Sequence, residues 1–130
     1  MQYLLLIYHK EDEWETLTED ERQKVYTEFQ TLRKKLIKKS NWIGGNQLQP
    51  VSTASTVRLK DKRPLITDGP FAETKEQLAG YFLVEAPNLD EALKIASRIP
   101  VATMGGSIEV RPVIMRTVEA GALTRTKPRI

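Results

Sequence analysis

Acidic and basic side chains gather in one short stretch of the sequence, residues 67–85 (TDGPFAETKEQLAGYFLVE). Asp68 stands at a sharp turn, because Gly69 has wide conformational freedom and the following proline fixes its own φ angle. A carboxylate and an ammonium group held close together can supply a general base and a cation for a small acidic or carbonyl substrate. We therefore take Asp68 as the first catalytic candidate, with Glu73 and Lys75 as candidates for substrate binding.

The same residues also have an ordinary structural interpretation. An aspartate in a turn commonly hydrogen-bonds to nearby backbone, and Lys75 can pair with a neighbouring carboxylate. Phe71 is expected to be an apolar anchor that buries the loop, and as such it is also a candidate for the wall of a substrate site.

Two further candidates lie at the ends of predicted strands. His9 is the one histidine of the chain and follows the first strand directly, beside Tyr8, where the ends of sheets commonly line clefts. An imidazole can transfer protons near neutral pH, so His9 is the second catalytic candidate, with Tyr8 as a substrate contact. The alternative is a solvated His9 in an ion pair with the acidic residues that follow. Arg111 could bind a substrate carboxylate in bidentate fashion, or it could pair with Glu85 or Glu109.

Several kinds of chemistry find no support in the sequence. The chain has no cysteine, so it has no disulfide, thiolate ligand or cysteine nucleophile. A single histidine and the lack of ligand-spaced acidic loops predict no metal site, and there is no glycine-rich phosphate motif or GxSxG serine. We expect no cofactor.

The net charge of +3 comes from the end of the chain, where residues 115–130 hold four basic residues and one acidic residue. A second basic group, residues 33–39, falls at the end of a predicted helix, where cations complement the helix dipole. A nucleic-acid partner is therefore not expected. The apolar run of residues 3–8 is too short for a signal peptide or a membrane span, which predicts a cytoplasmic protein with no membrane partner.

The hydrophobic pattern predicts the elements that position these side chains. Residues 2–8 and 77–85 predict strands that are apolar on both faces. Between them, an acidic loop at residues 10–15 is expected to place Trp14 over the core. Thr18 and Glu21 then form a capping box that predicts a helix up to about residue 39. Residues 41–50, which contain Gly44-Gly45, lead into a region of turns and strands.

The later elements follow from similar signals. Residues 56–60 and 64–67 predict a β-hairpin around Asp61-Lys62. Asn88 and Glu91 predict the start of a second helix that Pro100 ends, with an inward stripe of Ala92, Leu93, Ala96 and Ile99. Residues 107–114 predict a last strand, with Pro112 at a sheet edge or strand end.

This order predicts an α+β fold, a split βαβ plan with an inserted β-hairpin. Two helices can cover one face of the sheet, yet two strands are apolar on both faces, so a second layer must come from elsewhere. A homodimer with the sheets packed face to face is the simplest source of that layer. We assign residues 1–115 to the domain and residues 116–130 to a C-terminal arm or tail.

Residues 68–86, DGPFAETKEQLAGYFLVEA, resemble the signature of the DGPF proteins, a branch of the YCII-related family. The resemblance extends from MQYLLLIYHKED at the start, through LQPVSTASTVR, to GGSIEVRPV near Arg111. It implies a ferredoxin-like fold that pairs into a dimeric α/β barrel. It also implies, for several members, a histidine on the first helix that acts with an aspartate, and the predicted helix of this chain has no histidine.

Two functional hypotheses follow. In the first, the chain is a cofactor-independent enzyme, a lyase, isomerase or hydrolase, acting on a small organic acid near the dimer interface. Asp68 would then be the base, and Arg111 or Lys75 would bind the anion. In the second, it is a non-catalytic ligand-binding or interaction module, since the resemblance implies an association with sigma-factor systems.

Overall fold

The computed structural model of the chain describes residues 1–116. The predicted C-terminal arm or tail therefore lies outside the described residues, apart from Arg116. None of the helices within residues 1–116 is long and apolar enough to cross a membrane.

Four antiparallel strands form the main sheet in the order β2-β5-β1-β6. They are β1 (Gln2–His9), β2 (Trp42–Gln47), β5 (Gln77–Glu85) and β6 (Ser107–Pro112). The two strands predicted to be apolar on both faces, β1 and β5, lie side by side at the centre. β6 is an edge strand that ends at Pro112, as the missing N–H group of proline predicts. This α+β arrangement is compatible with the predicted ferredoxin-like fold.

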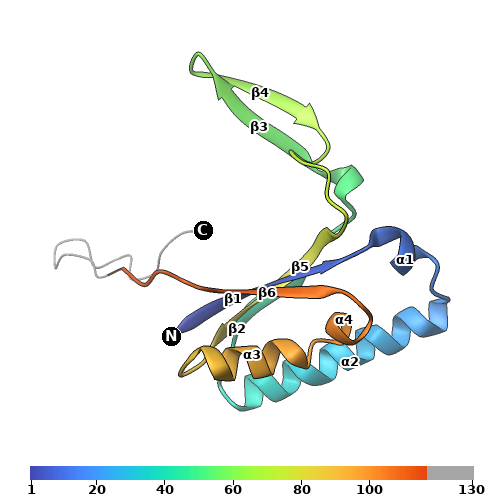
Figure 1. The fold of residues 1–130 in the computed structure, drawn as a ribbon, viewed down its shortest axis with the longest axis vertical. Helices are drawn as coiled ribbons and strands as arrows, with labels where there is room; N and C mark the ends of the chain where they lie inside the picture. Colours follow the sequence, from blue (N-terminus) through green and yellow to red (C-terminus); the bar gives the residue numbers. More distant parts are fainter. Residues whose placement is uncertain (117–130) are drawn as a thin grey trace.

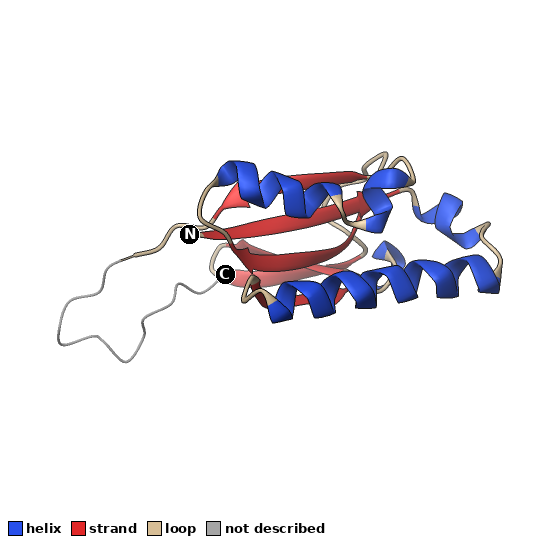
Figure 2. Cartoon of the chain, turned by 90° about the horizontal axis from the view of Figure 1, so that it is seen from below, coloured by secondary structure: helices blue, strands red, loops and turns tan. Residues whose placement is uncertain are grey.

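The long helices cover one face of this sheet (Figure 2). They are α2 (Glu19–Lys38) and α3 (Leu89–Ser97), and the short α4 (Pro100–Thr103) follows α3. Alternate residues of β1 and β5, namely Tyr3, Leu5, Ile7, Phe82 and Val84, form a buried core with Leu32 and Leu36 of α2. The hydrophobic core therefore lies between the sheet and α2, α3 and α4, as the alternation of the strands predicts.

A reciprocal capping box fixes the start of α2. The Thr18 hydroxyl accepts a hydrogen bond from the Glu21 N–H at 3.1 Å, and the Glu21 carboxylate accepts one from the Thr18 N–H at 2.8 Å. The backbone N–H of Thr18 and then its hydroxyl lower the pKa of Glu21 below its usual value of 4.5. The contribution of the charged box to stability is thus present above pH 4.5 and is lost as the pH falls through the lowered pKa.

Thr18→Ala is expected to reduce the free energy of unfolding by about 1 kcal/mol at neutral pH, because one N–H group at the start of α2 loses its acceptor. Thr31→Ala is the matched control, since Thr31 is exposed in the middle of the same helix. Urea unfolding of the three proteins measures the difference. Equal losses in the two variants would show that the cap has no special role.

Three local predictions were wrong, and one strand was missed. The acidic loop contains a helical turn, α1 (Glu11–Glu15), and residues 42–47 form strand β2, where no element was predicted. Pro100 begins α4, whereas α3 already ends at Ser97. On α3, Ile95 is buried and Leu93 is 46% exposed, so the inward stripe is shifted from the one predicted.

The predicted hairpin forms a separate two-stranded sheet, β3 (Ser55–Lys60) and β4 (Arg63–Asp68), after a short 3-10 turn, Val51–Thr53. Asp61 and Lys62 at its tip both have positive φ angles, as a tight hairpin turn between twisted strands requires. Figure 1 shows the hairpin extending from the sheet on the side away from the helices. The cross-strand pairs Val57–Ile66 and Leu59–Pro64 make one of its faces apolar and exposed.

The main sheet leaves its second face open. The side chains that alternate with the core residues lie there, and the apolar ones among them are half-buried: Leu4, Leu6, Tyr8, Tyr81 and Leu83. Asn46 of β2 donates a hydrogen bond to the Tyr81 hydroxyl on this face at 3.1 Å. We call these five half-buried residues the open face.

Candidate functional site

A cleft of about 260 Å³ lies between α2 and the helix-covered face of the sheet. Tyr26, Phe29, Gln30 and Arg33 of α2 line one side, at spacings of three and four residues that bring them to one face of the helix. Ile7 and His9 of β1, Trp42 and Gln47 of β2, and Ala79, Gly80 and Phe82 of β5 line the other side. A more open hollow of about 420 Å³ shares His9, Trp14 and Tyr26 with the cleft and forms its mouth.

Aromatic rings line both ends of this cleft. At one end, Trp14 meets Tyr26 edge to face with ring centroids 5.6 Å apart. At the other end, Phe82 packs edge to face against Phe29 at 6.0 Å and against Trp42 at 4.8 Å. Such pairs hold the rings at fixed angles, so the cleft has a defined shape.

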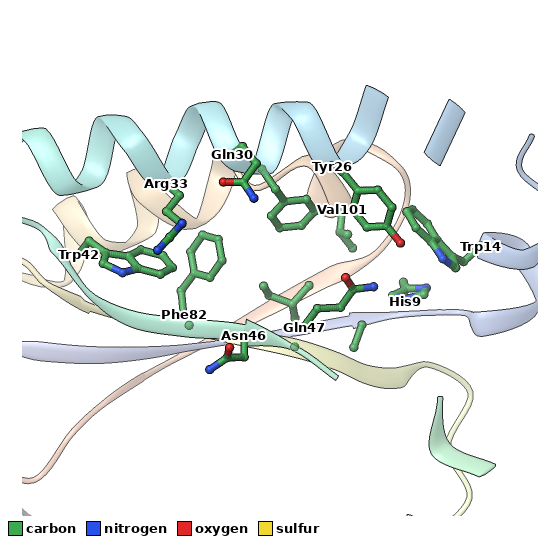
Figure 3. A pocket seen from close by; sticks show the side chains of 15 residues that line it. His9, Trp14, Tyr26, Gln30, Arg33, Trp42, Asn46, Gln47, Phe82 and Val101 are labelled. Atoms are coloured by element: carbon green, nitrogen blue, oxygen red, sulfur yellow. The ribbon is translucent and has the colours of Figure 1, made fainter. Parts of the chain in front are cut away.

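Polar groups occupy the two ends of the cleft (Figure 3). The guanidinium carbon of Arg33 lies 5.4 Å from the ring centroid of Trp42, a cation–π contact. At the opposite end His9 lies beside Trp14, with ring centroids 5.9 Å apart. Tyr26 and Arg33 are seven residues apart on α2, so the two ends are separated by about 10 Å along the helix.

Among residues 1–116, the ring of His9 makes a hydrogen-bond contact at Nδ1 alone, which leaves Nε2 available as a base. Its Nδ1 lies 3.1 Å from the carbonyl oxygen of Lys10, a contact that is a hydrogen bond in the tautomer with the proton on Nδ1. In the neutral ring the lone pair is then on Nε2. His9 is half-buried at the last position of β1, where it pairs with Gln77 of β5.

Gln77 joins three segments at the mouth of the cleft. Its side-chain oxygen accepts a hydrogen bond from the Glu11 N–H at 2.9 Å, and its amide group donates to the Thr74 carbonyl at 2.8 Å. The Glu11 carboxylate accepts a hydrogen bond from the Val51 N–H at 2.9 Å. The chain around residue 74, the start of α1 and the 3-10 turn are thereby held next to His9.

Gly45 allows β2 to approach Trp42 and β5 closely. A Cβ atom at Gly45 would lie 2.6 Å from the Trp42 ring and 2.7 Å from the Tyr81 carbonyl oxygen. A Cβ atom at the neighbouring Gly44 would have no heavy atom within 4 Å. The position of Trp42 in the cleft therefore depends on a glycine at residue 45.

Gly45→Ala is expected to destabilise the protein by about 2 kcal/mol, because the backbone oxygen of Tyr81 cannot move aside as a flexible side chain can. It should also displace Trp42 and change the emission spectrum of the folded protein. Gly44→Ala is the control and should leave both properties unchanged. Thermal unfolding monitored by fluorescence reports both, and equal stability of the two variants would contradict the close contact.

Comparison with known proteins shows to which family this chain belongs. The model of the YCII-related domain matches residues 1–117. The chain belongs to the YCII-related family. An uncharacterized protein of Rhizobium meliloti (strain 1021) is 34% identical over 116 residues, which is 88% of this chain and 94% of that protein. Membership of the DGPF branch remains a prediction.

Of the two predicted catalytic residues of this YCII-related protein, His9 lines the cleft and Asp68 does not. Asp68 is the exposed last residue of β4, opposite Ser55. At its turn, Gly69 has a φ of 92° and donates to the Ala54 carbonyl at 2.7 Å. Glu73 and Lys75 are exposed in the segment between β4 and β5. The structure therefore does not bring Asp68 together with His9 within one chain.

The remaining predicted residues lie elsewhere. Phe71 is 78% exposed, so the prediction that it buries the loop was wrong within the single chain. Tyr8 lies on the open face. Arg111 is exposed on β6, where its Nε lies 3.9 Å from a carboxylate oxygen of Glu109, one of the two ion pairs considered for it.

Sequence reasoning missed most of the residues that line the cleft. Arg33 was grouped with the lysines at the end of α2, yet its guanidinium group lies over Trp42. Tyr26, Gln30 and Arg33 flank the core stripe of α2 at helical spacing, which is the signal that could have placed them on one side of a cavity. Trp14 was predicted to cover the core, and it lines the cleft beside His9.

Proposed function

We propose that this YCII-related protein is a cofactor-independent enzyme that binds a small organic acid in the cleft and uses His9 to transfer a proton. The observation that supports this most directly is the presence of the His9 imidazole at one end of an apolar cavity and of the Arg33 guanidinium group at the other end. Concave apolar sites with a few polar groups are typical of small-molecule binding.

In this proposal the parts of the site have separate tasks. Arg33 attracts the acid group of the substrate, the aromatic rings exclude water around the reacting carbon, and Nε2 of His9 removes a proton from that carbon. A lyase or isomerase reaction can start from such a step, whereas in a hydrolase the same base would take its proton from the attacking water. The predicted roles of Asp68, Phe71, Glu73, Lys75 and Arg111 belong to this proposal as contributions that a second copy of the chain would have to make.

We also propose that the protein works as a homodimer in which the open faces pack together, giving a dimeric α/β barrel. The open face supports this, because five half-buried apolar or aromatic side chains at the centre of a sheet are left without a covering layer in one chain. The hairpin extends on the same side and exposes its own apolar face (Figure 1). An isolated two-stranded hairpin has marginal stability in water, so contact with a partner would stabilise it.

Proton transfer can be tested before the full reaction is identified. Small carboxylates and phenols are screened for ligands that raise the melting temperature, and each ligand is then incubated with the protein in D₂O. NMR spectra should show loss of a carbon-bound proton signal at a rate that falls at least about 100-fold in His9→Gln. Asp68→Asn, tested in parallel, measures the role of the other catalytic candidate.

The outcomes separate the two hypotheses. Exchange that depends on His9 supports the enzyme. Binding with no exchange in the wild-type protein would favour the non-catalytic ligand-binding module. Exchange that is unchanged in His9→Gln and lost in Asp68→Asn would move the catalytic site to the turn at Asp68.

A further inference from the structure

We infer that the ligand of the cleft is a flat aromatic acid, with its carboxylate against Arg33 and its ring between the aromatic side chains. This inference rests on the proposed binding of a small organic acid in the cleft and adds to it a ring, an orientation and a residue that recognises the charge.

The wall of the cleft favours a planar ring. Five aromatic residues from four separate segments line it: Trp14, Tyr26, Phe29, Trp42 and Phe82. They meet one another edge to face, so the space between them is bordered by both ring faces and ring edges. A further aromatic ring can continue this packing, with contacts that a saturated ring of similar size makes less well.

Arg33 supplies the charge that selects an acid. Among the described residues it forms no ion pair, whereas Arg22, about three turns earlier on α2, lies 3.8 Å from the Glu19 carboxylate. The stacking of Arg33 on Trp42 orients the planar guanidinium group and leaves N–H groups free for a carboxylate. A neutral ligand would gain at most a hydrogen bond from this group, without the attraction between opposite charges.

The charged residues at the two ends of the cleft set the orientation of the ligand. With the carboxylate at Arg33, a six-membered ring lies near Phe29 and Phe82, and a substituent on its far side points along α2 toward Tyr26 and His9 (Figure 3). The reverse orientation would put the carboxylate among Trp14, Tyr26 and His9, where the acidic side chains of Glu11 and Glu15 line the mouth. Repulsion by these two carboxylates disfavours an acid at that end.

The chain contains a direct reporter of this site. It has two tryptophans, and both line the cleft, so its intrinsic fluorescence responds to a ligand bound there. Full-length protein is titrated with three probes: benzoate, the neutral planar benzamide and the saturated acid cyclohexanecarboxylate. Calorimetric titration of the same probes checks that a change in fluorescence reflects binding.

We expect benzoate to bind at least about 10-fold more tightly than either of the other two probes. Arg33→Gln should weaken benzoate at least about 10-fold and leave benzamide unchanged, and Arg33→Lys, which keeps the charge without the planar fork, should fall between. Lys34→Gln is the matched control, because it removes the same charge from the neighbouring exposed residue. Melting curves of each variant confirm that it is folded.

The results distinguish this inference from the function on which it rests. If wild-type protein binds the three probes equally, or if Arg33→Gln keeps the preference for benzoate over benzamide, the aromatic-acid inference is wrong while ligand binding in the cleft stands. If no probe binds at millimolar concentration in either assay, both the inference and the proposed binding function are contradicted.

Discussion

Leu36→Ala should reduce the free energy of unfolding by about 3 kcal/mol, one of the two largest effects expected for single substitutions in this protein. Leu36 has no exposed surface and packs in the core between α2 and the sheet. Removing its side chain loses the transfer free energy of three buried carbon atoms and leaves a cavity, which costs about 2–5 kcal/mol for leucine in other cores. Urea unfolding at a single protein concentration measures the loss.

The substitution also bears on function, because α2 holds Tyr26, Phe29 and Arg33 over the cleft. A looser α2 should therefore weaken any ligand of the cleft as well as the fold. Leu93→Ala is the matched control, since Leu93 is 46% exposed on α3 and should lose less than about 1 kcal/mol. If the two variants lost equal stability, the placement of the core beneath α2 would be wrong.

The second large effect concerns the proposed dimer, which Leu6→Arg should dissociate. Leu6 lies near the middle of the open face, opposite Tyr81 of β5 and Glu109 of β6. In a two-fold dimer the substitution occurs twice in one interface, and burying each arginine costs several kcal/mol in desolvation, which exceeds the gain from a pair with Glu109. The dissociation constant should therefore rise at least about 100-fold.

Analytical ultracentrifugation over a range of concentrations measures this change. Leu93→Arg makes the same chemical change on the exposed side of α3 and should leave the dimer intact. A wild-type protein that sediments as a monomer at all concentrations would contradict the proposed dimer, and a dimer that tolerates Leu6→Arg would place the interface elsewhere.

Sequence signals predicted an element correctly where the residues that interact lie close together in the sequence. Thr18 and Glu21 are three residues apart, and they cap α2 as their types require. Asn88 likewise accepts a hydrogen bond from the Glu91 N–H at the start of α3. The hairpin was also confirmed, because its turn and its alternating strands lie within one short segment.

Strand β2 was missed because its glycines allow a close contact with β5, which is distant in the sequence. No strand was predicted around Gly44-Gly45, yet a Cβ atom at Gly45 would meet the Tyr81 carbonyl, and one at Gly80 would meet the Asn46 carbonyl at 2.7 Å. Glycine inside a strand often marks such a close approach of two backbones. The sequence of β2 alone cannot show this, since β5 follows 30 residues later.

The candidate site was predicted only at His9, for a related reason. The position of a histidine at the end of a strand is visible in the sequence, but the cleft depends on how α2 lies across β2 and β5. Arg33 and Trp42 come from a helix and from a strand that was not predicted, and their contact is tertiary. Asp68 and its neighbours attracted attention because their chemistry is concentrated in sequence, whereas the residues of the cleft come together only in the fold.

The central claim is that a small molecule binds between α2 and the sheet, and ¹H–¹⁵N NMR correlation spectra of the full chain test it most directly. On addition of 4-hydroxybenzoate we predict shifts of both indole N–H signals, from Trp14 and Trp42, and of the side-chain amides of Gln30 and Gln47, all of which line the cleft. Shifts confined to residues 68–76, with both indole signals unchanged, would contradict the account and place the binding site at the turn of Asp68.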